Sequence, residues 1–135
     1  MMQGLLQARR YHVRQERLRR QERERRRLQR YTSVRAAVEQ IAPAHPAVQA
    51  VFLFGSLVQP GRFTSRSDVD LAVDCDDLAA ESRFWQALEA TLQIDVDLRP
   101  RRGAVARAVD SQGECIYERA IPVAGAEHPA RSGSY

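Results

Sequence analysis

Two aspartates that alternate with apolar residues are the strongest chemical signal in this sequence of 135 residues. Asp68 and Asp70 stand in the segment Ser67-Asp68-Val69-Asp70-Leu71, and residues two apart on a β-strand lie on the same face. Two like charges on one face repel each other unless a cation lies between them. Mg²⁺ prefers carboxylate oxygens and takes its remaining ligands from water and substrate phosphates. The pair therefore predicts a magnesium-bound nucleotide.

A glycine-containing turn upstream is a candidate for holding the phosphates. The apolar run of residues 50–54 predicts a buried strand that ends at Gly55-Ser56. Gly55 permits close backbone approach, and the amides and hydroxyl of a turn that starts at Ser56 can bind phosphate oxygens. The polar segment that follows predicts a loop over this site, from which Arg62 and Arg66 could reach a triphosphate. The alternative for each arginine is an exposed loop residue that contacts only solvent.

A third carboxylate is expected from the next strand. The segment Gln93-Ile94-Asp95-Val96-Asp97-Leu98 again alternates acids with apolar residues, so that Asp95 and Asp97 share a face. Four carboxylates on two short strands are hard to explain by stability alone. We expect Asp95 to complete the metal cluster because it lies further inside the predicted strand, whereas Asp97 lies nearer Arg99 and could pair with an arginine.

A small sheet with helices is needed to bring these residues together. Asp74, Asp76 and Asp77 stand where a helix should begin, and helix capping is favoured over metal binding for them. The other expected elements are strands over residues 68–73 and 93–98, a helix beginning near residue 78, a short helix over residues 104–109 and a last strand over residues 114–118. The sequence thus predicts an α/β (α+β) fold, with a small mixed sheet flanked by helices, over residues 43–119.

The net charge of +4 conceals a basic arm at the N-terminus. Residues 1–35 hold twelve Arg against three Glu, a charge of +9, while residues 36–135 hold nine Arg against fourteen acids, a charge of −5. An arm over residues 1–42 should be a long helix, because residues 7–40 lack Gly and Pro and are rich in good helix formers. The simple interpretation is a solvated charged helix, and the alternative is an arm that binds nucleic acid or a partner.

Only the second half of this arm has an apolar stripe to bury. Its residues follow a spacing of three and four, and they are Leu28, Tyr31, Val34, Val38 and Ile41. Between Arg14 and Arg27 the only apolar residue is Leu18. We therefore expect the second half of the helix to pack against the body of the protein and the first half to project.

Composition narrows the class of protein further. No apolar run is long enough for a membrane span, and the first residues lack the pattern of a secretory signal. Cys75 and Cys115 have no metal-ligand spacing and are expected to be reduced thiols, which fits a cytoplasmic protein. Residues 120–135 are rich in Ala, Gly, Pro and Ser and predict a flexible tail.

The order of these features resembles a known family. The succession of strand, Gly55-Ser56, loop, Ser67-Asp68-Val69-Asp70-Leu71, helix and Ile94-Asp95-Val96 is similar to that of the minimal nucleotidyltransferases of the DNA polymerase beta superfamily. The resemblance covers about residues 51–119. The stretch between Ser56 and Asp68 has eleven residues, one more than is usual in that family. The arginine-rich arm lies outside the common core of the family.

This resemblance implies a reaction, a metal and a partner. Members of the family use Mg²⁺-bound nucleoside triphosphate, and many are antitoxins that silence a HEPN-domain toxin by transferring AMP from ATP to a toxin tyrosine. By this likeness the catalytic and metal-binding residues would be Asp68, Asp70 and Asp95, and the nucleotide would be held by Gly55, Ser56, Arg66 and Ser67. Two alternatives stay open, an antitoxin that neutralises its partner by binding alone and an adenylyltransferase for a small molecule such as an aminoglycoside.

Overall fold

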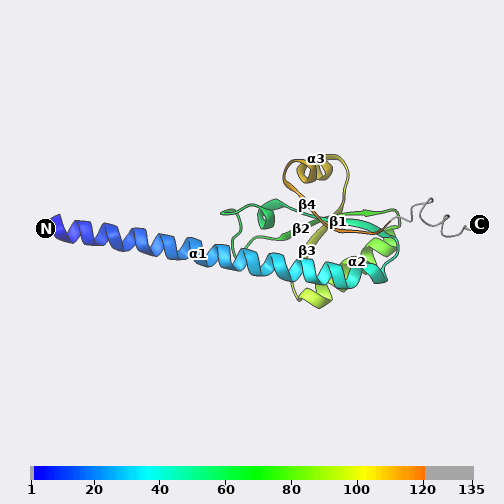
Figure 1. The fold of residues 1–135 in the computed structure, drawn as a ribbon, viewed down its shortest axis with the longest axis horizontal. Helices are drawn as coiled ribbons and strands as arrows, with labels where there is room; N and C mark the ends of the chain where they lie inside the picture. The colour runs from blue at the N-terminus through cyan, green and yellow to red at the C-terminus, as the bar shows by residue number, and fades with distance from the viewer. Residues whose placement is uncertain (1, 121–135) are drawn as a thin grey trace, which may run out of the picture.

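The computed structural model describes residues 2–120 and shows a long helix lying beside a small sheet that carries two shorter helices (Figure 1). The elements are α1 (Met2–Ile41), the 3-10 turn η1 (Ala42–Ala44), β1 (Val48–Phe54), the 3-10 turn η2 (Gly55–Val58), β2 (Val69–Cys75), α2 (Leu78–Leu92), β3 (Val96–Pro100), α3 (Gly103–Gln112) and β4 (Glu114–Glu118). The predicted fold class, a mixed sheet flanked by helices with a long N-terminal helix, is confirmed. The predicted flexible tail lies outside the described residues, which end at residue 120.

The four strands form one mixed sheet in the order β3-β2-β1-β4. β1 runs antiparallel to both β2 and β4, whereas β2 and β3 are parallel and are connected through α2. The register places Asp70 of β2 opposite Phe54 at the end of β1 and opposite Asp97 of β3. The end of β1, Asp70 and Asp97 therefore lie side by side on three neighbouring strands.

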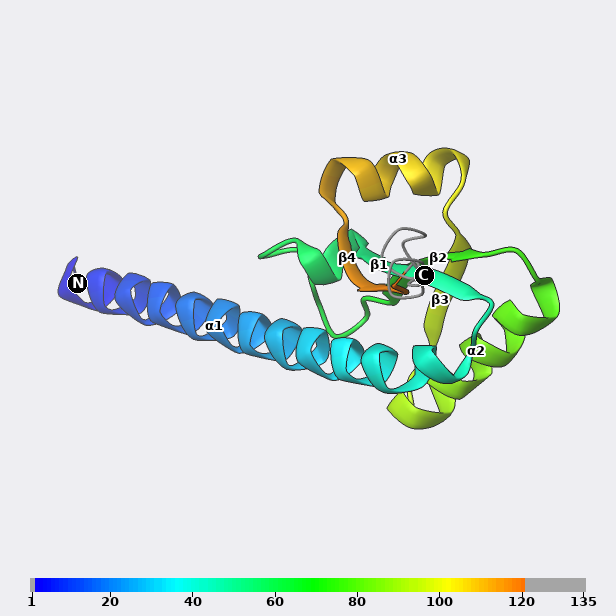
Figure 2. The same cartoon turned by 45° about the vertical axis from the view of Figure 1, so that its right-hand side comes forward.

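The two faces of the sheet have different roles. The C-terminal half of α1 and α2 lie on one face, and α3 lies on the other (Figures 1 and 2). On the face covered by α1 and α2, buried residues of β2 pack with buried residues of these two helices; they are Val69, Leu71 and Val73 of β2, with Val34, Val38, Phe84 and Leu88. Because side chains alternate along a strand, Asp70 points away from this core, to the face that carries α3.

The N-terminal helix α1 is continuous over 40 residues, and its first half projects beyond the body (Figure 1). Its second half packs as predicted, with Val34 and Val38 fully buried and Tyr31 and Ile41 partly buried. The expectation for Leu28 is wrong, because its side chain is 49% exposed. Within residues 2–120, no helix combines the length and the apolar character that a membrane crossing would need.

Arg27 takes the place on the buried stripe that Leu28 was expected to fill. The side chain of Arg27 is only 8% exposed. Its guanidinium donates a hydrogen bond to the carbonyl oxygen of Leu57 (2.8 Å) and pairs with Glu24. A buried charge is tolerated when it is paired and hydrogen-bonded. Arg27 thereby ties α1 to η2, the turn that begins at Gly55.

Of the acids expected to cap α2, Asp77 does so, and Asp74 has a different structural partner. Asp77 is the N-cap of α2, and its Oδ1 accepts hydrogen bonds from the backbone N–H groups of Ala79 (2.9 Å) and Ala80 (3.2 Å). Asp74 forms a two-pronged ion pair with Arg101, with both N–O distances at 2.9 Å. These contacts satisfy the two carboxylates without a metal.

Candidate active site

Asp70 is the centre of the acidic site. Its side chain is half-buried in β2, with Asp68 two residues earlier in the chain and Asp97 directly across in β3. Burial is the largest cause that raises the pKa of Asp70, and the charges of Asp97 and then Asp68 raise it further, while Arg99 lowers it. The three carboxylates therefore lie close enough to repel one another, as expected where a cation is to be bound.

Gly55 brings the turn after β1 into direct contact with this centre. Its φ of +78° lies in the left-handed region, which glycine adopts without steric cost. A Cβ placed on Gly55 would overlap with Oδ2 of Asp70 and lie only 3.2 Å from its Cγ. The Gly55-Ser56 turn and the acids thus form one site, as the sequence predicted, and glycine is required there for space as well as for backbone conformation.

The structure places Asp97, rather than Asp95, beside Asp70. β3 begins only at Val96, because α2 ends in a left-handed residue, Gln93 (φ 58°), and the chain needs the next residues to turn into the strand. Asp95 precedes the strand and is exposed. The expectation that Asp95 lies further inside the strand is therefore wrong. Both segments alternate acids with apolar residues. Aligning them as parallel neighbours, with Asp70 opposite Asp97, could have identified Asp97 from the sequence.

Arg99 lies on the same face and pairs with Asp97, the pairing that the sequence suggested as an alternative to metal binding. It follows Asp97 by two residues, and its Nε and Nη2 contact the two carboxylate oxygens of Asp97 at 3.1 and 3.0 Å. Among residues 2–120, no three side chains of His, Cys, Asp or Glu converge as a metal-binding group. With both oxygens of Asp97 directed to Arg99, Asp68 and Asp70 are the carboxylates left for a metal.

The loop before β2 holds the other two predicted nucleotide-binding residues. The Ser67 hydroxyl oxygen accepts a hydrogen bond from the backbone N–H of Thr64 (2.8 Å). The backbone N–H of Arg66 donates to the Thr64 hydroxyl (3.2 Å), and the Arg66 side chain is exposed. The Ser67 hydroxyl therefore stabilises the loop directly before Asp68. Ser56 lies in η2, partly buried, beside Gly55.

Comparisons with known proteins agree with this geometry. The protein-family model described as polymerase beta, nucleotidyltransferase matches residues 36–121. A toxin-antitoxin structure with AMP-PNP is 29% identical, with a TM-score of 0.53, and the match covers 63% of this chain and 73% of that chain. The toxin-antitoxin MntA-HpeT, in a mutant with two aspartates two positions apart changed to glutamate, is 26% identical over the same shares, with a TM-score of 0.52. No curated protein matches the chain.

Proposed function

Because the chain belongs to the polymerase beta nucleotidyltransferase family, we propose that it transfers AMP from ATP to a hydroxyl group of a partner protein. The observation that carries this proposal is the contact between Gly55 and the carboxylate of Asp70, which joins a phosphate-binding turn to a cluster of acids. A site of this kind can hold a triphosphate and neutralise the charge that develops at the phosphorus being attacked.

Asp68 and Asp70 are the residues that would hold Mg²⁺, with Asp97 in the role that Asp95 was expected to fill. The donor set fits the ion, because it consists of neighbouring carboxylate oxygens; burial raises the pKa of Asp70, and repulsion from Asp97 and Asp68 raises it further. When bound, Mg²⁺ would neutralise charge on the attacking and leaving oxygens. Asp97 would join these ligands once its carboxylate leaves Arg99, and Arg99 would then be free for a phosphate oxygen.

The backbone and side chains around the turn would position the nucleotide. The amides of Gly55 and Ser56 and the Ser56 hydroxyl would bind the terminal phosphates. Arg66, exposed on the loop, would contact the triphosphate from outside, and Ser67 would fix the loop in place. The choice of ATP is supported by the AMP-PNP in a similar structure of 29% identity. Pyrophosphate would leave from the side of the Gly55-Ser56 turn.

The partner we propose is a HEPN-domain toxin, modified on a tyrosine hydroxyl and thereby neutralised. The sequence resemblance implies this partner, and two similar structures with TM-scores above 0.5 are toxin-antitoxin complexes. A small-molecule acceptor is less favoured, since both of these similar structures contain a toxin and an antitoxin.

The test is a transfer assay with the protein encoded by the adjacent reading frame, which we expect to contain a HEPN domain. Both proteins are incubated with Mg²⁺ and ATP labelled on the α-phosphate, and label on the partner is measured. We expect label with the wild type and with Asp95→Asn, and none with Asp70→Asn or Asp97→Asn. Full neutralisation of the partner by Asp70→Asn, with no label from the wild type, would refute transfer and support neutralisation by binding alone.

A further inference from the structure

A basic seam runs between α1 and the loop of residues 59–67, which precedes β2. Three adjoining cavities form it, with volumes of about 390, 270 and 400 Å³. Adjacent cavities share lining residues, and all three share Phe63. The seam is therefore one continuous surface feature. The residues of α1 that line it precede residue 36, where the match to the nucleotidyltransferase family begins.

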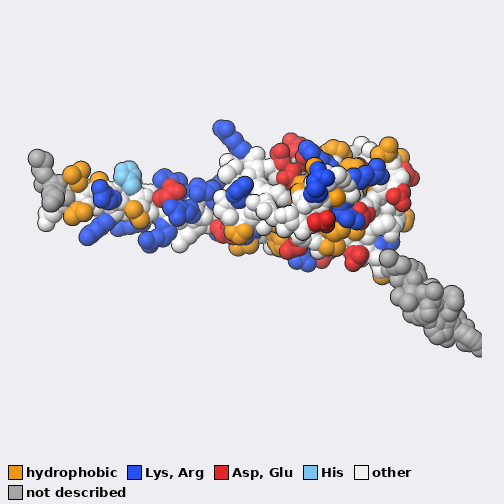
Figure 3. All heavy atoms as spheres, turned by 90° about the horizontal axis from the view of Figure 1, so that it is seen from above, with side chains coloured by type: hydrophobic (Ala, Val, Ile, Leu, Met, Phe, Trp, Pro, Cys, Tyr) orange, Lys and Arg blue, Asp and Glu red, His pale blue; other side chains and the backbone are white. Residues whose placement is uncertain are grey.

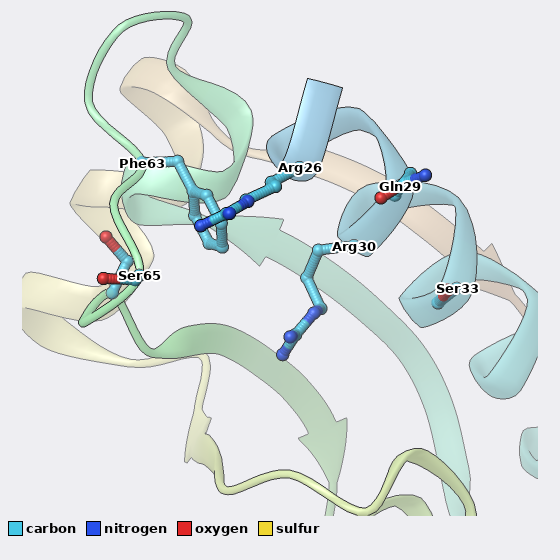
Figure 4. Close-up of a pocket in the computed structure, with 7 residues that line it drawn as sticks. Arg26, Gln29, Arg30, Ser33, Phe63 and Ser65 are labelled. Carbon is cyan, nitrogen blue, oxygen red and sulfur yellow. The ribbon is translucent and has the colours of Figure 1, made fainter. Parts of the chain in front are cut away.

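Arginines of α1 supply one wall of the seam. Arg20, Arg23, Arg26 and Arg30 line it, and their spacing of three and four keeps them on one side of the helix. Figure 4 shows Arg26 and Arg30 extending from α1 toward the loop that carries Phe63 and Ser65. Over residues 20–30 this row of guanidinium groups is about 15 Å long, at 1.5 Å of rise per residue.

Arg30 is available for an outside ligand. Arg20, Arg23 and Arg26 each have a glutamate of α1 within ion-pair distance. Within the described chain, by contrast, the Arg30 guanidinium has neither an ion pair nor a hydrogen bond, although its side chain is partly buried in the seam. A partly buried guanidinium without an anion is costly, and a phosphate group would satisfy it with charge-assisted hydrogen bonds.

The remaining residues that line the seam favour a phosphate-containing ligand over a partner protein. Besides arginine and Phe63, the cavity that contains Arg30 is lined by hydroxyl and amide side chains, which are Gln29, Ser33, Ser65 and Ser67. These are the groups that contact the sugar-phosphate backbone of nucleic acids. Phe63 is only 7% exposed and cannot serve as an anchor for a partner protein, and protein interfaces depend on such desolvated aromatic or aliphatic anchors.

The basic row continues along the projecting half of α1 (Figure 3). Arg9, Arg10, Arg14 and Arg17 line a further groove there. A free diphosphate or triphosphate would occupy one cavity, whereas a linear polymer of phosphates can follow the whole row. We propose that the seam and the adjoining face of α1 bind the backbone of a single-stranded nucleic acid. The seam adjoins the transfer site through Ser67, which lines it, but its arginines come from α1 and take no part in the transfer.

The test compares two double variants that remove the same charge. Arg26→Gln/Arg30→Gln acts inside the seam. Arg19→Gln/Arg83→Gln is the control, because Arg19 also has an intrahelical glutamate partner and Arg83 lies exposed on α2, and neither lines the seam. Binding of fluorescein-labelled oligouridine of 20 nucleotides is followed by anisotropy at several salt concentrations, with circular dichroism and urea unfolding to verify the fold.

We expect wild-type affinity to fall steeply with salt, and the seam variant to bind about tenfold more weakly with a shallower salt slope, by about 0.7 per lost phosphate contact. The control should change affinity by less than about threefold. Arg26→Lys/Arg30→Lys should restore most of the binding. Equal losses in the seam variant and the control would overturn the proposal, as would absent binding at 50 mM salt or equally effective competition by a poly-glutamate of matched charge.

Discussion

Replacing Gly55 by alanine should separate the function of the site from the stability of the fold. Two costs arise from the structure. The first is backbone strain, since φ is +78°, and a left-handed conformation costs an alanine about 1–2 kcal/mol. The second is displacement of the Asp70 carboxylate, because the new Cβ would overlap with its Oδ2. The carboxylate is the free end of a side chain and can rotate away, so its displacement should cost little stability but should disrupt metal and nucleotide binding.

Gly61→Ala is the matched control for this variant. Gly61 has almost the same φ, +84°, but a Cβ there would meet no atom within 4 Å. Both variants should therefore lose about 1–2 kcal/mol of unfolding free energy in urea, from strain alone. Titration calorimetry with AMP-PNP and Mg²⁺ should detect binding to Gly61→Ala and weakening of at least about tenfold in Gly55→Ala, equivalent to 1.4 kcal/mol.

Either of two results would refute this reasoning about Gly55. One is unchanged nucleotide affinity in Gly55→Ala. The other is equal weakening in both variants, which would mean that backbone strain, rather than contact with Asp70, governs the site.

Three further predictions concern individual side chains. Asp97→Asn should abolish transfer and Asp95→Asn should leave it intact in the labelling assay, because only Asp97 lies opposite Asp70; the reverse result would restore Asp95 as the third acid. Arg27→Met should lower the urea-unfolding free energy by about 2 kcal/mol by leaving the Leu57 carbonyl without its charged donor, whereas exposed Arg25→Met should change it by less than about 0.5 kcal/mol. Since the folded state raises the pKa of Asp70, ionisation of this carboxyl opposes folding above its ordinary pKa. In the absence of metal, Asp70→Asn should therefore be more stable than wild type at pH 7, by less than about 1 kcal/mol for a half-exposed group. This gain in unfolding free energy should vanish below about pH 4, where the carboxyl is protonated in both states. A gain that persists at pH 3 would exclude ionisation of Asp70 as its cause.

Local sequence signals predicted most of the elements because their causes are local. The apolar run of β1 ends at Gly55, and Asp77 caps α2 with its own carboxylate. The alternation of acids with valine and leucine in β2 separates the core face from the acidic face without reference to other segments. In these elements the residues that determine the structure lie within a few positions of one another, so the pattern sufficed.

One error arises from a partner that is distant in sequence, and the other from a helix end that lacks its usual sequence signal. Arg27 belongs on the buried stripe because a carbonyl 30 residues later accepts its hydrogen bond, and periodicity of apolar residues cannot detect this partner. Asp95 lies before the strand rather than inside it because the start of β3 depends on a left-handed residue, Gln93, that closes α2. Helix-end geometry of this kind is usually signalled by glycine, and here the residue is glutamine.

The parallel pairing of β2 with β3 makes the turn after α2 intolerant of insertions. The same register that sets Asp97 opposite Asp70 also directs Val96 and Leu98 into the core. One extra residue between Gln93 and Val96 would have to be absorbed in the turn, or it would shift β3 by one position and reverse every side chain between the two faces. The exposed turn of residues 60–62 carries no such constraint, so length variation should be tolerated there and rejected at residues 93–95.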